Sequence, residues 1–191
     1  MMMHWLKSNH QTVTSLSAVL LSVVALYVAW DQSRVMRAQQ HAAVWPAVQI
    51  QTQFSTREDG YIMLFNVKND GIGPAVVEHV YAEMDGQPLL NWEQFGDRVP
   101  EGLGRPGMWT GSLRGEILAP GEESILAQLT WSRDGIHTNL IREYRSTLWS
   151  TNIEICYCSV YGRCWTVDND RTEIQPEAVD QCPAADPDSN L

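Results

Sequence analysis

The four cysteines are the residues of this chain whose type and spacing allow chemistry, and all of them fall between positions 156 and 182. Cys156 and Cys158 lie two apart on a predicted strand, so they share a face and do not readily bond to each other. Cys164 lies across the predicted bend from Cys158, close enough for a bridge, and Cys182 would then hold the tail to the sheet through Cys156. Four cysteines allow three full pairings, and the sequence alone does not choose among them.

Two alternatives to disulfides remain open for these cysteines. A Cys₄ zinc site is disfavoured because the C-x-C-x₅-C spacing lacks the usual C-x₂₋₄-C knuckle and no histidine lies nearby. Four reduced thiols in a cytosolic domain are the second alternative. Disulfides are favoured, and they place the domain in an oxidising compartment. For a bacterial protein this compartment is the periplasm, with the amino terminus inside.

No catalytic or cofactor motif stands out elsewhere in the chain. The five histidines are dispersed, and His79 follows Glu78 on a predicted strand, where neighbours face opposite sides and make a poor acid–base couple. There is no G-x-S-x-G, P-loop or dinucleotide fingerprint. We therefore expect no enzymatic activity, no cofactor and no metal. The alternative is a ligand-binding protein or hydrolase with its site in the glycine-rich region 87–113, where Trp92 and Trp109 are candidates for an interaction patch.

An uncharged run at residues 12–30, TVTSLSAVLLSVVALYVAW, predicts a single membrane-spanning helix. Its serines and threonines can hydrogen-bond to carbonyls one turn earlier. Trp5, Tyr27 and Trp30 lie near its ends, where aromatic rings favour the membrane interface. A cleaved signal peptide is the alternative, but its apolar region would be shorter and a small residue would replace Tyr27. The flanking basic residues are too few to orient the span.

Residues 31–191 carry 23 acidic and 12 basic residues, a net charge of −11. A domain this acidic lacks the basic face that nucleic acid requires and is repelled by anionic lipid headgroups. We therefore expect no nucleic-acid partner. The expected partners are the lipid bilayer, through the helix, and a protein or a second copy of the chain.

The chain divides into five predicted parts: an amino-terminal tail at 1–11, the span at 12–30, a helical stalk at 31–43, a domain at 44–175 and an acidic tail at 176–191, whose last residues we expect to be disordered. Pro46 ends the stalk, because the residue before proline is pushed towards extended geometry. Within the domain we predict strands at 47–54, 61–68 and 75–86, a strand–turn–strand at 116–131, a helix at 138–149 and a cysteine hairpin at 150–167.

These elements predict a mainly β fold. Short strands with short connections are typical of an antiparallel β-sandwich, and one helix is inserted before the final hairpin. Asp85-Gly86 is a strong turn signal at the end of the third strand. Region 87–113 reads as a long connection rather than a lid.

Two turn segments carry a resemblance. Residues 69–75 (NDGIGPA) and 118–123 (LAPGEE) together resemble bacterial immunoglobulin-like adhesion and binding modules, in which an N-x-G stretch follows one strand and an L-x-P-G-E turn joins two later strands. The layout of an anchor, Val44-Trp45-Pro46 and residues 156–161 (CYCSVY) also resembles uncharacterised single-pass proteobacterial membrane proteins. The resemblance implies an immunoglobulin-like sandwich and no known activity.

The resulting expectation is a membrane-anchored, non-enzymatic interaction module in a bacterial envelope complex, placed in the inner membrane with its carboxy-terminal domain in the periplasm. A cytosolic domain acting as a sensor or regulator at the inner leaflet is a further alternative. The state of the cysteines distinguishes these two compartments.

Overall fold

The computed structural model describes residues 10–99, 102–133, 140–142, 144–145, 151–169, 176–184 and 191. The chain forms two compact units, residues 1–43 and residues 44–191.

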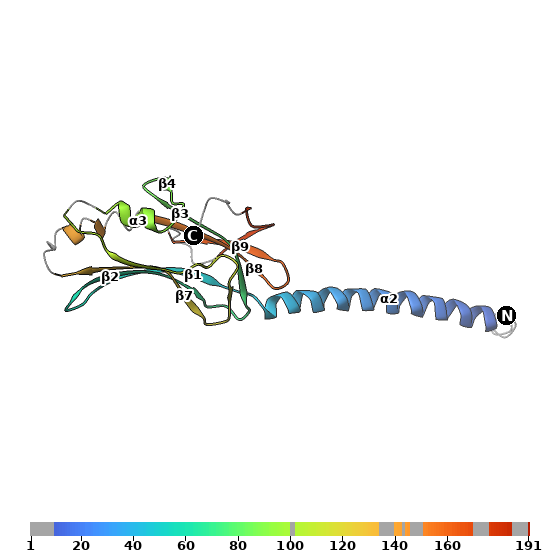
Figure 1. Ribbon diagram of the computed structural model, residues 1–191. Coiled ribbons are helices and arrows are strands. Elements are labelled where there is room, and N and C mark those ends of the chain that lie inside the picture. The colour runs from blue at the N-terminus through green and yellow to red at the C-terminus, as the bar shows by residue number, and fades with distance from the viewer. Residues whose placement is uncertain are drawn as a thin grey trace. The chain divides into compact units, whose positions relative to one another are not determined.

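The first unit is the long helix α2, His10–Ala43, which contains both the predicted span and the predicted stalk without a break (Figure 1). Its apolar window has a mean hydropathy of 2.0 and none of it is buried, so by length and composition the helix can cross a membrane. The hydroxyls of Thr14, Ser15 and Ser22 donate to carbonyls four residues earlier, at 2.8–2.9 Å, as predicted for this run. These bonds satisfy the polar side chains within the helix itself.

The second unit is a β-sandwich of two antiparallel sheets with an added short helix. Figure 1 shows the sheet of β1, β2 and β7 facing the sheet of β3, β8 and β9. The first sheet has the order β1-β2-β7-β5, and the second has the order β10-β9-β8-β3-β4, with β6 also paired to β3. The elements are β1 (Val48–Thr56), β2 (Gly60–Asn69), β3 (Ala75–Met84), β4 (Gln87–Pro88), α3 (Glu93–Asp97), β5 (Gly107–Thr110), β6 (Ile117–Leu118), β7 (Glu123–Ser132), β8 (Thr151–Ser159), β9 (Cys164–Asp168) and β10 (Glu177–Val179).

The core lies between the sheets and follows the alternation of the strands. Met63 and Phe65 of β2 and Ile153 and Ile155 of β8 are fully buried. On β3 the buried positions change parity, from Ala75 and Val77 to Val80, Ala82 and Met84. The change occurs at a β-bulge between Val77 and His79, where the pairing with β8 shifts by one residue. The bulge explains why residues 75–84 alternate less cleanly in the sequence than the other strands.

The Asp85-Gly86 turn joins β3 to β4 as a two-residue hairpin. Asp85 has φ 52° and Gly86 has φ 70°, and Met84 pairs with Gln87. Positive φ at both central residues is the geometry that Asp-Gly favours, because it matches the twist of the flanking strands. The structure thus confirms the turn predicted at Asp85-Gly86.

The strand–turn–strand predicted at 116–131 is correct in its elements, but the two strands do not pair with each other. β6 pairs with β3, whereas β7 pairs with β2 and β5 in the other sheet. The Pro120-Gly121 turn therefore carries the chain from one sheet to the other. Local turn chemistry predicts where a chain reverses, but not which sheet receives the next strand.

The acidic tail predicted at 176–191 is partly built into the domain. β10 pairs with β9, Cys182 is disulfide-bonded to Cys156, and Leu191 is buried. The expectation of disorder is therefore wrong for the last residue. Composition does not reveal that a disulfide and a buried leucine hold this segment. Residues 185–190 lie outside the described part of the chain.

Region 87–113 is packed rather than loose. It contains β4, α3 and β5, and its apolar side chains Leu89, Trp92, Phe95 and Leu103 are buried in the core. Phe65 of β2 stacks on Trp92 at 6.3 Å and meets Phe95 edge-on at 5.5 Å. This region covers one part of the core instead of forming a mobile loop over a site.

The helix predicted at 138–149 falls largely on residues outside the described part of the chain. The described residues 140–142 and 144–145 are helical, and Ile141 and Tyr144 are buried. Tyr144 meets Trp131 of β7 edge-on at 5.7 Å. The described turn thus packs the predicted apolar face against the sandwich.

The buried phenol of Tyr157 should make the free energy of unfolding of the domain depend on pH in the alkaline range. Burial raises the pKa of its phenol to about 12, and the hydrogen bond donated by Val48 N–H (3.3 Å) offsets this only in part. Because the unfolded phenol ionises near pH 10, its contribution is complete below pH 10 and is lost as the pH rises towards about 12. Tyr157→Phe should remove this pH-dependent loss, which amounts to about 2 kcal/mol at pH 11.5.

Urea unfolding between pH 7 and pH 11.5 measures this effect. Burial also raises the pKa of Tyr144, so some alkaline dependence should remain in the Tyr157→Phe variant. An unchanged alkaline slope in that variant would show that the Tyr157 phenol ionises without unfolding.

Candidate functional site

The most distinctive surface of the sandwich is the end at which residues 44–47 enter β1, which we call the entry end. Large apolar side chains from separate segments are exposed there: Trp45, Ile72, Ile117, Val160 and Tyr161. The pairings of β3 bring these segments together, since Ala75 pairs with Ser159 and with Leu118. Ile72 and Ile117 are 66% and 61% exposed. Such gathered apolar residues are typical of protein-contact surfaces.

Asn69 organises the entry end from within. Its buried amide nitrogen donates to the carbonyls of Gly73 (2.8 Å) and Leu118 (3.0 Å). Its amide oxygen accepts from the N–H groups of Ala47 (3.1 Å) and Gly71 (3.0 Å). One side chain thus ties the start of β1, the β2–β3 loop and the end of β6 together.

The backbone of Asn69 adds a further link at the entry end. Its N–H donates to the carbonyl of Glu122, and its carbonyl accepts from Gly121 N–H. Gly73 approaches the entering chain so closely that a Cβ there would lie 2.1 Å from the Val44 carbonyl oxygen. The two turn segments that carry the sequence resemblance therefore meet in space, and Asn69 is the residue that joins them.

Charge at the entry end is locally paired. Lys68, the only lysine after the helix, forms an ion pair with Asp70. The hydrogen bond to Asp70 and the charge of this carboxylate raise the pKa of Lys68.

Two disulfides hold the hairpin beside the entry end. Cys158 and Cys164 are directly opposite on β8 and β9 and are bonded, with Cα atoms 4.0 Å apart. Cys156 is bonded to Cys182, with Cα atoms 5.6 Å apart. These are the two pairs that the strand geometry favoured. Because Sγ atoms engaged in disulfides are not thiolates, the grouping of Cys158, Cys164 and Cys182 is no zinc site in this state.

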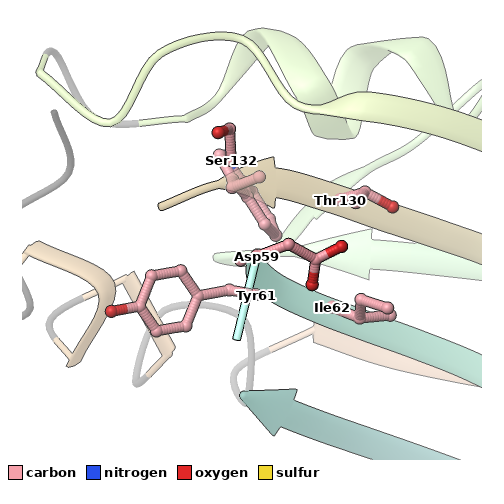
Figure 2. Close-up of a pocket in the computed structure, with 7 residues that line it drawn as sticks. Asp59, Tyr61, Ile62, Thr130 and Ser132 are labelled. Atoms are coloured by element: carbon pink, nitrogen blue, oxygen red, sulfur yellow. The ribbon is translucent and has the colours of Figure 1, made fainter. Parts of the chain in front are cut away.

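One cleft lies at the opposite end of β2 and β7, lined by Asp59, Gly60, Tyr61, Ile62, Thr130, Trp131 and Ser132 (Figure 2). Its volume is about 310 Å³. Figure 2 shows the Tyr61 ring directed away from Asp59. The lining contains one carboxylate and three hydroxyls, but no histidine, cysteine or lysine. These residues do not form a nucleophile with an adjacent base.

A second cleft of about 390 Å³ lies in the glycine-rich region, lined by Gln87, Pro88, Leu90, Gln94, Asp97 and Arg98. Its charged groups already have partners within the chain. Asp97 pairs with Arg105 at 2.7 Å, and Arg98 donates to the Met84 carbonyl at 2.9 Å. The cleft therefore offers a weak basis for the hydrolase or ligand-binding alternative.

The predicted patch of Trp92 and Trp109 is wrong for Trp92. Trp92 is buried, because the core under α3 needs a large ring next to Phe65. Trp109 is 55% exposed on β5. Both residues lie in the glycine-rich region of the sequence, which suggested a common surface, but only Trp109 reaches solvent.

The predicted membrane-interface residues lie on α2. Tyr27 and Trp30 are exposed, and the Arg34 guanidinium lies 5.7 Å from the centre of the Trp30 ring. Trp5 lies outside the described residues.

Sequence reasoning missed the apolar members of the entry end. Ile72, Ile117 and Val160 lie within or beside turns, in apolar runs too short for periodicity to assign a face. Their signal was a large apolar side chain at a turn position that favours polar residues. Their proximity follows only from the pairing of β3 with β6 and β8.

No protein-family model matches the chain, and no curated protein matches it.

Proposed function

We propose that this chain is a membrane-anchored, non-enzymatic protein-interaction module of a bacterial envelope complex. The observation that carries the proposal is the group of exposed apolar side chains at the entry end. They come from four segments and are held by a fully hydrogen-bonded Asn69 and by a disulfide. A rigid apolar surface loses little conformational entropy on binding, which favours a stable protein contact.

The periplasm is the compartment that best fits the domain. Helix α2 is apolar enough to cross the inner membrane, and two disulfides persist in an oxidising environment. This arrangement leaves the amino terminus in the cytoplasm. The partner is then a periplasmic protein or another subunit in the same membrane.

An immunoglobulin-like sandwich is part of the same proposal. The strand orders β1-β2-β7-β5 and β9-β8-β3 correspond to the ABED and GFC sheets of constant-type immunoglobulin domains. The disulfides differ, because they lie within one sheet and its tail rather than between the two sheets. Domains of this type commonly present binding surfaces at the ends of the sandwich.

Site-specific photo-crosslinking of the full chain in cells tests the proposed function. A photoreactive residue at Ile72 or Ile117 should give an adduct with a distinct protein, whereas one at Thr130, which is exposed on β7, should not. Ile72→Ser and Ile117→Ser should each lower partner capture about tenfold, as expected for loss of an apolar hot spot.

Trp109→Ser serves as the matched control, since it removes another exposed apolar side chain outside the entry end. Equal loss of capture in Trp109→Ser would transfer the contact to β5. No adduct from either entry-end position would contradict the proposal.

A further inference from the structure

Five of the described strands lie at sheet edges, and β1 differs from the other four. β5, β10, β4 and β6 have four, three, two and two residues, and Pro106 precedes β5 while Pro88 belongs to β4. β1 has nine residues, and its register against β2 is unbroken from Val48 to Thr56. Its sequence, VQIQTQFST, has no charge and no proline. Natural edge strands usually carry charged residues or a proline, which prevent pairing with another strand.

The register shows which backbone groups of β1 face away from β2. Asp70 N–H donates to the Ala47 carbonyl, and Arg57 N–H donates to the Gly60 carbonyl, both at 2.8 Å. Val48 N–H instead donates to Tyr157 in the other sheet. Because the direction alternates along a strand, odd-numbered residues bond to β2 and even-numbered residues point to the free edge. Within the described part of the chain, nothing hydrogen-bonds to Ile50, Thr52 or Phe54 at this edge.

The side chains of the same three residues face the core, and β9 of the other sheet lies near β1. Ile50 and Phe54 are partly buried and pack against the core. Thr52 lies midway between them, and its hydroxyl is buried without a hydrogen-bond partner in the described structure. A buried hydroxyl without a partner costs free energy.

We propose that β1 pairs antiparallel with β1 of a second copy of this chain, about a two-fold axis at Thr52. In this register Ile50 lies opposite Phe54 of the second copy, and the two Thr52 residues lie opposite each other. Both pairings join residues whose backbone groups point to the free edge, as antiparallel pairing requires. Facing threonines are a favourable cross-strand pair.

Two observations favour a second copy over an unrelated strand. The register is self-complementary in shape and free of charge, so no like charges face each other although each domain carries −11. Two copies anchored in one membrane also have a high effective concentration, which compensates for the small area of a strand-edge contact. The pairing uses β1 and not the entry-end side chains, so it holds or fails independently of the proposed function.

Cysteine cross-linking in membranes of cells that make the full chain tests the pairing. All four native cysteines are in disulfides, so an introduced cysteine supplies the free thiol. Opposed Cα atoms in this register lie about 5.5 Å apart, within disulfide reach. Thr52→Cys should therefore form a covalent homodimer under mild oxidation. Gln49→Cys is the matched control, because its two copies would lie about 20 Å apart.

Thr52→Pro gives a second, independent measurement. It removes an N–H that points to the free edge, so it should lower the dimer fraction of detergent-solubilised chain about tenfold. Gln51→Pro removes an N–H that bonds to β2, so it should instead destabilise the fold. A monomeric wild-type chain in membranes, or Thr52→Cys adducts with a different protein only, would overturn the proposal. If Thr52→Pro abolishes the dimer but a photoreactive residue at Ile72 still captures a partner, the pairing of β1 and the proposed function are separate properties.

Discussion

Replacing Asn69 with leucine is expected to lower the free energy of unfolding of the domain by about 4 kcal/mol. Leucine has a similar size but makes none of the four side-chain hydrogen bonds of Asn69. The buried carbonyls of Gly73 and Leu118 and the partly buried N–H groups of Ala47 and Gly71 would then lack their partner. Each buried group left unsatisfied costs about 1–3 kcal/mol, and partial relaxation reduces the sum. Urea unfolding of the full chain in detergent, followed by tryptophan fluorescence, measures the change.

Asn69→Asp separates the two halves of this network. The carboxylate keeps the acceptor for Ala47 and Gly71 but places negative charge against the Gly73 and Leu118 carbonyls. The loss in free energy of unfolding should therefore be comparable to that of Asn69→Leu. It should decrease at acidic pH, where the carboxyl is protonated. Asn66→Leu is a suitable comparison for Asn69→Leu, because Asn66 is equally buried but donates one side-chain hydrogen bond in the described structure, to Glu123. A loss below about 1 kcal/mol in Asn69→Leu would show that water enters the entry end and replaces the bonds.

Removing the disulfide between Cys156 and Cys182 is expected to be the second large perturbation. The double variant Cys156→Ala/Cys182→Ala should lose about 3.5 kcal/mol, because the bridge closes a loop with a sequence separation of 26 residues. Cys158→Ala/Cys164→Ala, with a separation of 6, should lose about 2.5 kcal/mol. The first variant should also release β10, which is paired only with β9 among the described strands. Unfolding midpoints and limited proteolysis at β10 measure both effects.

The wild-type chain provides the control for this pair of variants. In intact cells without reductant, all four cysteines should resist alkylation if the domain is periplasmic. Equal losses of stability in the two double variants would show that loop entropy does not govern these bridges. Alkylation of all four cysteines in the cell would place the domain in the cytosol.

Much of the fold follows from local sequence patterns. The uncharged run at 12–30, the alternation in β1 and β2, and the Asp85-Gly86 turn each report a short-range preference that the surrounding structure does not overrule. The hairpin of β8 and β9 brought Cys158 opposite Cys164, because register follows from a short turn.

Other features required information that no local pattern carries. Trp92 is in the core rather than on a surface, although it lies among glycines and charges. β6 and β7 separate into different sheets, although a Pro-Gly turn joins them. In both cases the deciding contacts come from residues far along the chain, Phe65 for Trp92 and Ala75 for β6.

The sequence alone determined which parts the protein contains: an apolar helix, an acidic sandwich and four cysteines able to form two disulfides. These properties depend on side-chain chemistry and on spacings of a few residues. The tertiary structure alone decided that Asn69 joins two distant turns, that the exposed apolar residues gather at one end, and that β1 is left as a long unpaired edge. The physical reason is that sheet pairing brings together segments separated by tens of residues, and only that pairing decides which polar groups are satisfied and which remain available to a partner.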